Sequence, residues 1–476
     1  MNGKKIFLIW ADGRPEIIKM ISELEENGHQ VVYWVGAGNP DLSRLKKHTI
    51  YHDHYAAWAG RPAKGINLEN FPPPNKNLLE RLSGTESIIL SMMNKKFDSL
   101  CVDERKHIYY SMLRYWYGII NEFNPEVIVF PSIPHTVYNY LISELALLLG
   151  IKTIMFEDTW VANRVITYAD WKLGSEDLRD ALRKNYRKNF SVKDLGENMR
   201  TYYYSVRQSK DYIPEYMIFY NKKFTGLNWF RTKLNILGQS IKQGNVFHKL
   251  PNYILKWFKM NLEKEYINVE TPPDFSKKFV YVPLGFQPER TTSPQGGVFV
   301  DQILMIETLS TSLPKDWVIY VKEHPGQWML RAGVNYSSSR YPGYYKKCAQ
   351  VKNVKIVPIN TSSHELISKS QAVALTTGTA GFEAILKYKP VIIFGYPWYR
   401  DFSKIFMVNG VNTCREAFTI INGSYNLGEQ DIINYLKSFE DGTLDGFLET
   451  VPGRRLDISL EESMKNITNY ILKKIQ

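Results

Sequence analysis

Short apolar runs that alternate with helix-like stretches, at both ends of the chain, constrain the fold more than any other feature. The first run, 4–10, is bounded by polar residues, and a helical stretch follows it as far as Asn27-Gly28, a typical helix stop. Continuous apolar strands that alternate with helices are typical of a parallel sheet covered on both faces. The pattern therefore predicts a doubly wound α/β fold.

The alternation occupies two separate parts of the chain. In the first part we expect strands at 4–10, 29–36, 126–132 and 152–158, and helices near 103–123 and 136–150. In the second part we expect strands at 279–285, 317–324, 354–359, 372–378 and 390–395, and helices near 299–313, 341–350, 363–370, 380–388 and 460–474. Two Rossmann-like domains that face each other across a cleft are therefore predicted.

The middle of the chain loses this rhythm and sets the expected domain boundaries. Thr271-Pro272-Pro273-Asp274 is a plausible linker. We predict an N-terminal domain over 1–275 with a basic helical insertion at about 176–270. A C-terminal domain over 276–455 follows, and a last helix over 456–476 is expected to pack back on the N-terminal domain.

Composition excludes several classes of protein. No run of about 20 apolar residues predicts a transmembrane helix, and MNGKKIFLIWADGRPE resembles a first strand more than a signal peptide. Three widely spaced cysteines, Cys101, Cys348 and Cys414, exclude a disulfide framework and favour a reducing, cytoplasmic location. His52-Asp53-His54 contains two metal-binding residue types without an evident third ligand, so no metal site is expected.

The net charge of +12 is concentrated in one stretch. Between 220 and 260 there are eight Lys or Arg and no Asp or Glu, with aromatic residues interleaved. Such a stretch is either a solvated helical region or a surface that meets anionic lipid or an anionic acceptor. No nucleic-acid-binding motif surrounds it, so nucleic acid is not an expected partner.

The strongest candidate binding segment is the turn at 376–383. Thr376, Thr377 and Gly378 end a predicted strand, and a helix begins near Thr379 and contains Gly381 and Glu383. Small residues let a phosphate approach the backbone, while the helix N-terminus offers free N–H donors. Glu383, one turn into the helix, is placed to accept from a ribose or sugar hydroxyl. A plain strand, turn and helix with a Thr cap is the alternative.

Two more segments follow strands of the same domain, where ligands bind in open α/β sheets. Glu323-His324-Pro325 turns at the proline, which holds His324 at the strand end, where it can donate to a phosphate oxygen. Gln287 lies in a polar loop after the domain's first strand. We predict that these residues help to bind a nucleotide-activated donor.

In the N-terminal half, the adjacent carboxylates Glu157 and Asp158 follow a buried strand. One of them could act as general base on an acceptor hydroxyl; the alternative is a helix cap or a salt bridge with Arg164. Because successive residues of a strand point to opposite sides, only one should face the cleft. The remaining predicted acceptor-side residues also follow strands: Asp12, Arg14, Ser132 and His135.

These motifs resemble those of the bacterial capsule polysaccharide biosynthesis and export transferases, the group that contains the β-Kdo transferases. The family's Glu-x-Gly, Arg-Pro and Ile-Thr segment appears as Glu157-Asp158-Thr159 and Arg164-Val165-Ile166-Thr167, with Thr159 and Val165 in place of Gly and Pro. His324-Pro325 and Thr377–Ala384 match the family's His-Pro pair and Thr-Gly turn. Bacterial sialyltransferases have similar motifs in the same order.

The resemblance implies a GT-B glycosyltransferase without a metal or other cofactor. Its donor would be CMP-linked Kdo or another ulosonic acid, and its acceptor a surface polysaccharide or lipid-linked glycan. The basic 220–260 stretch would bring this cytoplasmic enzyme to such a glycan at the inner face of the membrane. In this alignment Glu157 takes the family's base position, and His324 contacts the donor phosphate. Alternatives are a UDP-sugar, dTDP-sugar or polyol-phosphate donor, and a non-catalytic, membrane-associated assembly protein.

Overall fold

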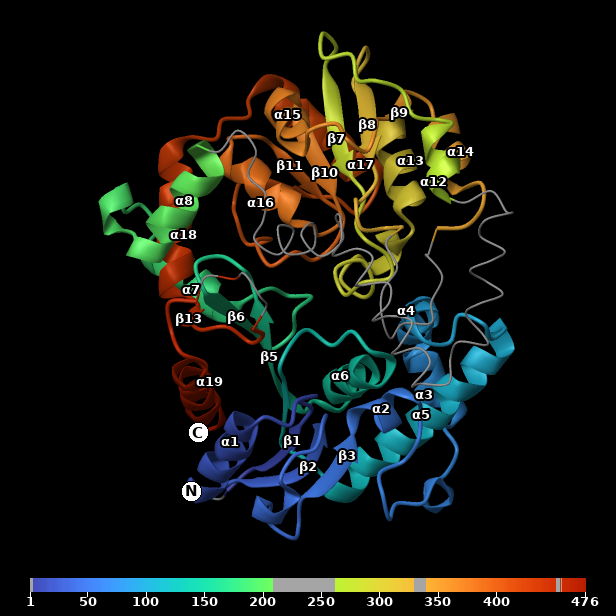
Figure 1. The fold of residues 1–476 in the computed structure, drawn as a ribbon, viewed down its shortest axis with the longest axis vertical. Helices are drawn as coiled ribbons and strands as arrows, with labels where there is room; N and C mark the ends of the chain where they lie inside the picture. The colour runs from blue at the N-terminus through green and yellow to red at the C-terminus, as the bar shows by residue number, and fades with distance from the viewer. Residues whose placement is uncertain (1–2, 209–261, 329–339, 451–453, 455) are drawn as a thin grey trace, which may run out of the picture.

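The computed structural model describes residues 3–208, 262–328, 340–450, 454 and 456–476, which form two α/β domains (Figure 1). The basic stretch at 220–260 lies outside the described residues. No helix in the part of the chain that is described has the length and apolar character needed to cross a membrane. Both predicted Rossmann-like domains are present, and the fold class is confirmed.

The N-terminal domain is built on a seven-stranded sheet in the order β13-β6-β5-β4-β1-β2-β3. Its strands are β1 (Lys5–Leu8), β2 (Gln30–Gly36), β3 (Ile50–Asp53), β4 (Val127–Phe130), β5 (Lys152–Asp158), β6 (Arg164–Tyr168) and β13 (Leu444–Asp445). The five from β3 to β5 are parallel, whereas β6 and β13 are antiparallel additions at one edge. The strand order reverses between β1 and β4, which makes their carboxyl ends the expected binding crevice.

Alternating side chains of β1 divide the core of this domain between the two faces of the sheet. Ile6 and Leu8 pack with α1 (Pro15–Glu26) and α19 (Leu460–Ile475), which lie against each other. Phe7 and Ile9 face the cluster that includes α4 (Ser83–Met92), α5 (Val102–Phe123) and α6 (Val137–Leu149). The C-terminal helix thus packs on the N-terminal domain, beside the start of the chain (Figure 1).

The C-terminal domain contains a six-stranded parallel sheet in the order β12-β11-β10-β7-β8-β9. Its strands are β7 (Phe279–Pro283), β8 (Val318–Lys322), β9 (Val354–Ile356), β10 (Ala372–Leu375), β11 (Val391–Ile393) and β12 (Ile405–Met407). One face packs against α13 (Gln302–Ser312), α14 (Tyr344–Gln350) and α17 (Val411–Gly423). The other packs against α15 (Ser363–Lys369) and α16 (Thr379–Leu386). The order reverses between β7 and β10.

The middle segment does not form a separate insertion in its described parts. Helix α7 (Glu176–Lys184) packs on α18 (Glu429–Asp441), and α8 (Glu197–Gln208) packs on α16 of the C-terminal domain. Helix α12 (Leu262–Ile267) packs on α14, where the Glu265 carboxylate accepts from the Tyr345 N–H at 2.8 Å. The buried faces of these described helices are therefore covered by elements of the C-terminal half of the chain.

Several short elements complete the described chain. They are α2 (His54–Trp58), α3 (Lys76–Arg81), and the 3₁₀ turns at Leu42–Arg44, Leu68–Asn70, Met93–Lys95, Val192–Asp194 and Gly297–Val300. His52 contacts the Tyr33 hydroxyl at 2.8 Å, and His54 contacts the Tyr138 hydroxyl at 2.7 Å, so each has a partner within the domain.

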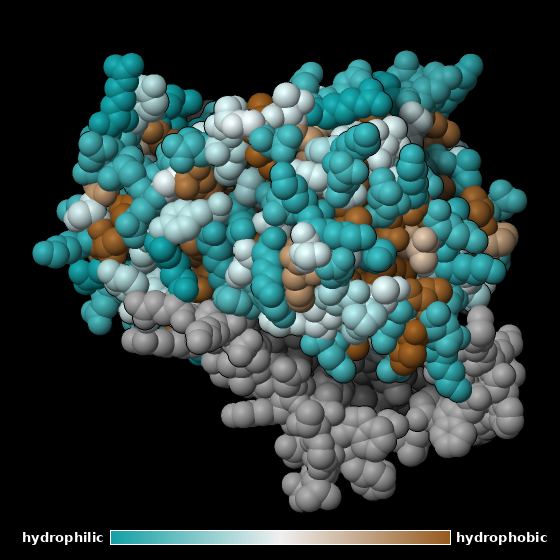
Figure 2. All heavy atoms as spheres, turned by 90° about the horizontal axis from the view of Figure 1, so that it is seen from above, coloured by the Kyte–Doolittle hydropathy of each residue, from teal (hydrophilic) through white to brown (hydrophobic). Residues whose placement is uncertain are grey.

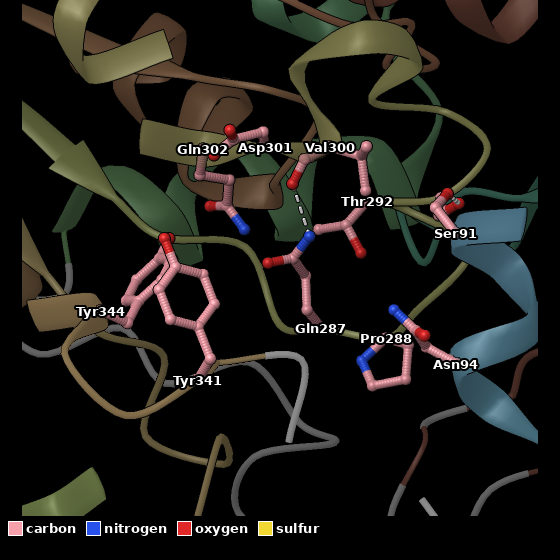
Figure 3. Close-up of a pocket in the computed structure, with 11 residues that line it drawn as sticks. Ser91, Asn94, Gln287, Pro288, Thr292, Val300, Asp301, Gln302, Tyr341 and Tyr344 are labelled. Atoms are coloured by element: carbon pink, nitrogen blue, oxygen red, sulfur yellow. Dashed lines mark hydrogen bonds between the residues drawn. The ribbon is translucent and has the colours of Figure 1, made fainter. Parts of the chain in front are cut away.

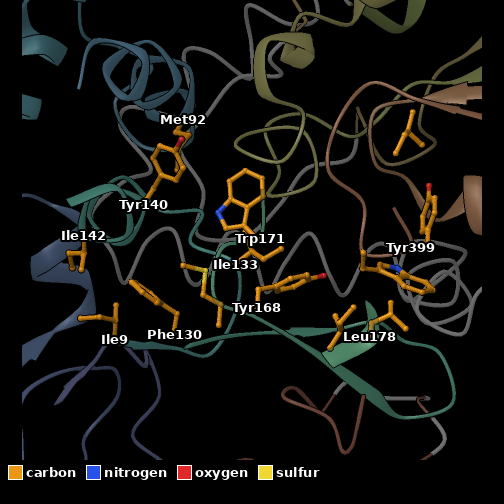
Figure 4. Close-up of a cluster of buried hydrophobic side chains, with 14 of the residues drawn as sticks. Ile9, Met92, Phe130, Ile133, Tyr140, Ile142, Tyr168, Trp171, Leu178 and Tyr399 are labelled. Carbon is orange, nitrogen blue, oxygen red and sulfur yellow. The ribbon is translucent and has the colours of Figure 1, made fainter. Parts of the chain in front are cut away.

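One buried cluster runs through both domains. Figure 4 shows its course from Ile9 and Phe130 of the first sheet, past Tyr168 and Trp171, to Tyr399 of the second domain. The Trp171 and Tyr396 rings meet edge to face at 5.3 Å across the domain boundary. The outer face of the molecule, seen from above in Figure 2, is mainly hydrophilic with scattered hydrophobic side chains, as is usual for solvent-facing surface. The two domains therefore share a core on their facing sides.

Candidate functional site

Three polar segments meet at the carboxyl edge of the second sheet. Strands β10, β7 and β8 are parallel neighbours, so the turn at 376–379, the loop at 284–301 and the His324 turn follow adjacent strand ends. The strand order reverses between β7 and β10, where doubly wound sheets bind their ligands. The structure thus brings the three predicted donor-side segments to one edge.

The Thr-Gly turn opens helix α16 as predicted. Gly378 is the N-cap residue and has no capping side chain, so the first N–H groups of the helix are not satisfied by a cap. Thr376 and Thr377 are buried, and the Thr377 hydroxyl donates to the Thr291 carbonyl, whereas Thr379 is exposed. The free N–H groups and the exposed hydroxyl can meet an anion.

Gly381 has a packing role that the sequence did not indicate. A Cβ atom at this position would lie 2.2 Å from the Tyr399 hydroxyl oxygen. That hydroxyl donates to the Gly378 carbonyl at 2.7 Å, so Tyr399 holds the turn through this hydrogen bond. Gly381 is therefore required for the close approach of Tyr399. Glu383, half-buried on the same helix, has a pKa raised to about 7 by burial.

The His324 turn fixes the imidazole in one tautomer. The Gly326 N–H donates to Nδ1 of His324 at 3.1 Å, and the Phe286 ring lies 5.5 Å from the imidazole. Since Nδ1 accepts, the neutral ring carries its proton on Nε2. Half-buried His324, beside exposed Pro325, can therefore present an N–H donor at the strand end.

Glu323 and Gln287 connect the segments of this edge through a buried arginine, Arg340. The Glu323 carboxylate accepts from Nε of Arg340 at 2.8 Å and from the Tyr345 hydroxyl at 2.6 Å, and neither charged side chain is exposed. Gln287 accepts from the same arginine and donates to the Val300 carbonyl at 2.5 Å. Arg340 thus organises both segments, and no sequence motif pointed to it.

Across the boundary, Glu157 lies at the end of β5 and faces the second domain. Its carboxylate accepts from the Tyr168 hydroxyl at 2.7 Å and from the Gln295 amide at 3.5 Å, and it pairs with Arg290 at 3.2 Å. Burial raises the pKa of Glu157, while Arg290 and the Tyr168 hydrogen bond oppose that rise. Glu157 is therefore a buried carboxylate at the interface whose proton affinity depends on its neighbours.

Asp158 points away from Glu157, as strand geometry requires, and takes the cap role rather than the pairing with Arg164. It pairs with Arg454 at 2.5 and 2.8 Å and caps the following turn by accepting from the Trp160 N–H at 3.2 Å. Of the two expected roles, the structure therefore shows the cap, and Arg454 takes the place of Arg164 as the ion-pair partner. Arg164 pairs with Asp445 of β13, because β6 carries its side chain to that edge of the sheet.

The remaining acceptor-side residues separate into two groups. Asp12 pairs with Arg14, which donates to the Leu448 carbonyl at 3.2 Å, while the Leu448 N–H donates to Asp158 at 3.2 Å. Asp12 and Arg14 are therefore grouped with Asp158 rather than with Glu157. The Ser132 hydroxyl contacts the Ile133 carbonyl at 3.4 Å and lies within the turn after β4.

His135 belongs to the Glu157 side. Its Nδ1 donates to the Ile133 carbonyl at 2.8 Å, which leaves the lone pair of the neutral ring on Nε2. Burial, with Lys95 and Arg290 nearby, lowers the pKa of His135 to about 3, so the ring is neutral at physiological pH. His135 thus places a neutral imidazole, with an unprotonated Nε2, on this side.

The loop after β7 joins the two halves of the candidate site. Arg290 and Gln295 contact Glu157, while the Thr291 carbonyl accepts from Thr377 and the Gln295 amide donates to the Tyr396 carbonyl at 3.2 Å. Neither Gln295 nor Arg290 was among the predicted site residues. Their position after the first strand of the domain was the available signal.

A cavity of about 180 Å³ opens between the domains beside this loop (Figure 3). Ser91 and Asn94 line it from the N-terminal domain, and Gln287, Ser293 and Tyr341 line it from the C-terminal domain. The Ser91 and Ser293 hydroxyls are in hydrogen-bonding contact at 3.0 Å across the boundary. The cavity carries hydroxyl, amide and aromatic groups, which are the types that contact sugars.

Two doubly wound domains with facing polar carboxyl edges define the GT-B-like class of fold. Within the second domain, residues 277–402 match the model of a family described as "Capsule polysaccharide biosynthesis protein". The matched segment contains β7 to β11, His324, the Thr-Gly turn and the loop with Arg290. The resemblance to capsule polysaccharide biosynthesis proteins is confirmed over this segment.

Solved structures give weaker likenesses. The β-Kdo 2,7 transferase KpsC of Thermosulfurimonas dismutans is 14% identical with a TM-score of 0.36, over 75% of this chain and 88% of that chain. The UDP-GlcNAc 2-epimerase of Methanocaldococcus jannaschii is 15% identical with a TM-score of 0.25, over 92% and 98%. That of Neisseria meningitidis is 12% identical with a TM-score of 0.24, over 98% and 100%. No curated protein matches the sequence.

Proposed function

We propose that the protein is a glycosyltransferase of capsule or related surface-polysaccharide assembly, which transfers Kdo or another ulosonic acid from a CMP-linked donor. The observation that carries the proposal is the placement of buried Glu157 opposite a family-matched edge that contains His324 and the Thr-Gly turn. A base and a leaving-group site on facing domains are what transfer to a hydroxyl requires.

In the proposed reaction, the acceptor hydroxyl loses its proton to Glu157 as it attacks the donor sugar. The bond between the sugar and the nucleotide phosphate breaks at the same time, and the phosphate leaves with the electron pair. The N-terminus of α16 and Nε2–H of His324 stabilise the developing phosphate charge. These groups can carry that charge without a metal, so we propose no cofactor.

The donor can be tested by ligand-induced stabilisation. We expect CMP to raise the melting temperature more than UDP or dTDP, because a ligand that binds only the native state stabilises it once its concentration exceeds the dissociation constant. Differential scanning fluorimetry with matched concentrations of CMP, UMP, UDP and dTDP measures this.

Turnover assays with CMP-Kdo and a capsular glycan acceptor complete the test. A clear preference for UDP or dTDP would contradict the ulosonic-acid donor while leaving a glycosyltransferase in place. Absence of transfer with every nucleotide sugar and with polyol-phosphate donors would favour a non-catalytic assembly protein.

We also propose that the protein works in the cytoplasm at the inner membrane face, through the basic stretch at 220–260. Each Lys or Arg near an anionic surface contributes about 1 kcal/mol of binding, screened beyond about 10 Å at 0.1 M salt. Cosedimentation with anionic vesicles should therefore be weak and should fall as salt rises. Charge reversal of Lys222, Lys223, Arg231 and Lys233 should abolish it, and unchanged binding would contradict the proposal.

A further inference from the structure

The ion pair between Arg290 and Glu157 closes the base off from any acceptor. The side chain of Glu157 is 3% exposed and that of Arg290, which pairs with it at 3.2 Å, is 22% exposed, so of the two side chains that of Arg290 is the more accessible to solvent. A general base must come within about 2.6–3.2 Å of the hydroxyl that it deprotonates. Tyr168, Gln295 and Arg290 already surround the carboxylate, so at least one of them must leave before an acceptor can reach it.

Arg290 is the member of this set best placed to leave. Tyr168 is buried in β6 and Gln295 is also bound to the Tyr396 carbonyl, whereas the Arg290 side chain is partly exposed. Its neighbour Thr291 is bound to the Thr377 hydroxyl, at the turn that opens α16. Arg290 is therefore the chain neighbour of the residue that contacts this turn, where an anionic donor would meet the helix N-terminus.

The charges around Arg290 favour an incoming anion. Burial is the main cause of the lowered pKa of His135, and the charges of Lys95 and Arg290 lower it further, while Glu289 and the Ile133 hydrogen bond oppose them. A guanidinium binds carboxylate or phosphate through two parallel hydrogen bonds, a stronger arrangement than a single contact. In addition, Oε1 of buried Gln295 has no hydrogen-bond partner among the described residues, so this loop conformation leaves an acceptor unsatisfied.

We propose that Arg290 is a donor-sensing residue that exchanges its partner: it pairs with Glu157 before the donor binds and moves to an acidic group of the donor afterwards. The inference rests on the proposed function and extends it. The exchange uncovers Glu157 only when a donor is in place, and it selects donors that carry a negative charge within reach of residue 290. It also removes the positive charge that opposes protonation of Glu157, which makes this carboxylate a stronger base.

A double-mutant cycle on donor binding tests the exchange without any turnover. Glu157→Gln removes the competitor for Arg290 with little change of shape, so we expect CMP-Kdo to bind about tenfold more tightly than to the unmodified protein. In an Arg290→Gln background the same change should alter affinity less than about twofold. Isothermal titration calorimetry measures the four affinities, and Arg183→Gln, which removes an exposed arginine of α7, is the matched control.

Proton uptake provides a second readout. Because Arg290 opposes protonation of Glu157, its departure should make donor binding take up protons, measured in buffers of different ionisation enthalpy. The uptake should disappear in Glu157→Gln and in Arg290→Gln. If Arg290→Gln does not fold, Arg290→Lys should give a weaker version of both effects.

Equal effects of Glu157→Gln in the two backgrounds would overturn the exchange, as would weaker donor binding in Glu157→Gln alone. If another nucleotide sugar stabilises the protein best, that molecule replaces CMP-Kdo in the cycle. Coupling between Glu157 and Arg290 in donor affinity, without sugar transfer, would contradict the proposed function but support the exchange. Sugar transfer without this coupling would support the proposed function but contradict the exchange. Failure of every nucleotide sugar to bind would overturn both.

Discussion

Replacement of Glu157 by Gln is expected to lower sugar transfer by about 10²–10⁴-fold while the donor still binds, at least as tightly as it binds to the unmodified protein. The change removes the proton acceptor and keeps the size of the side chain and its hydrogen bond with Tyr168. Initial rates with saturating donor, compared with donor affinity by calorimetry, separate the two effects. Retained activity in folded Glu157→Gln would move the base elsewhere, with His135 the first candidate and Asp12 the second.

Asp158→Asn is the matched control on the neighbouring residue. Asp158 pairs with Arg454 and accepts from the Trp160 and Leu448 N–H groups, so its loss should lower the free energy of unfolding by about 1–3 kcal/mol. Activity per folded molecule should stay near normal, because these contacts lie on the side of the strand away from Arg290. Urea unfolding and active-site titration measure the two quantities. If the two variants exchange phenotypes, the base is Asp158.

The arrangement of the two sheets could be predicted from local patterns. Parallel strands buried on both faces are continuous apolar runs, and Gly150, with a φ of 70°, ends α6 where a helix stop was expected. The packing of α7, α8 and α12 could not be predicted in this way. Their amphipathic faces indicate that something covers them, but the covering helices α18, α16 and α14 lie far away in the sequence.

The site shows the same division between local and long-range information. Alternation along β5 correctly predicted that Glu157 and Asp158 would face opposite sides. The partners of these residues come from positions 290, 295 and 454, and no spacing rule connects them to the strand. For Glu323, the local pattern favoured a ligand contact because the residue follows a strand. In the structure its side chain is buried in an ion pair with Arg340, a partner that the local pattern did not indicate.

Replacement of His324 by Ala is expected to lower transfer by about 10²–10³-fold while the fold is preserved, since a single donor to developing charge typically contributes that much. The Gly326 N–H holds Nδ1, so Nε2–H is the group that can reach the phosphate. The half-buried ring contacts Phe286, and its loss should cost little stability.

His324→Asn tests the assignment of the nitrogen, and His107→Ala, at an exposed position of α5, is the control for loss of an imidazole. An asparagine amide is too short to replace Nε2, so His324→Asn should be as impaired as His324→Ala. The loss should appear in kcat more than in the donor KM, because the charge on the phosphate grows as the bond breaks. Steady-state rates at saturating acceptor measure both constants. Near-normal kcat in folded His324→Ala would leave His324 as a structural residue of the turn after β8.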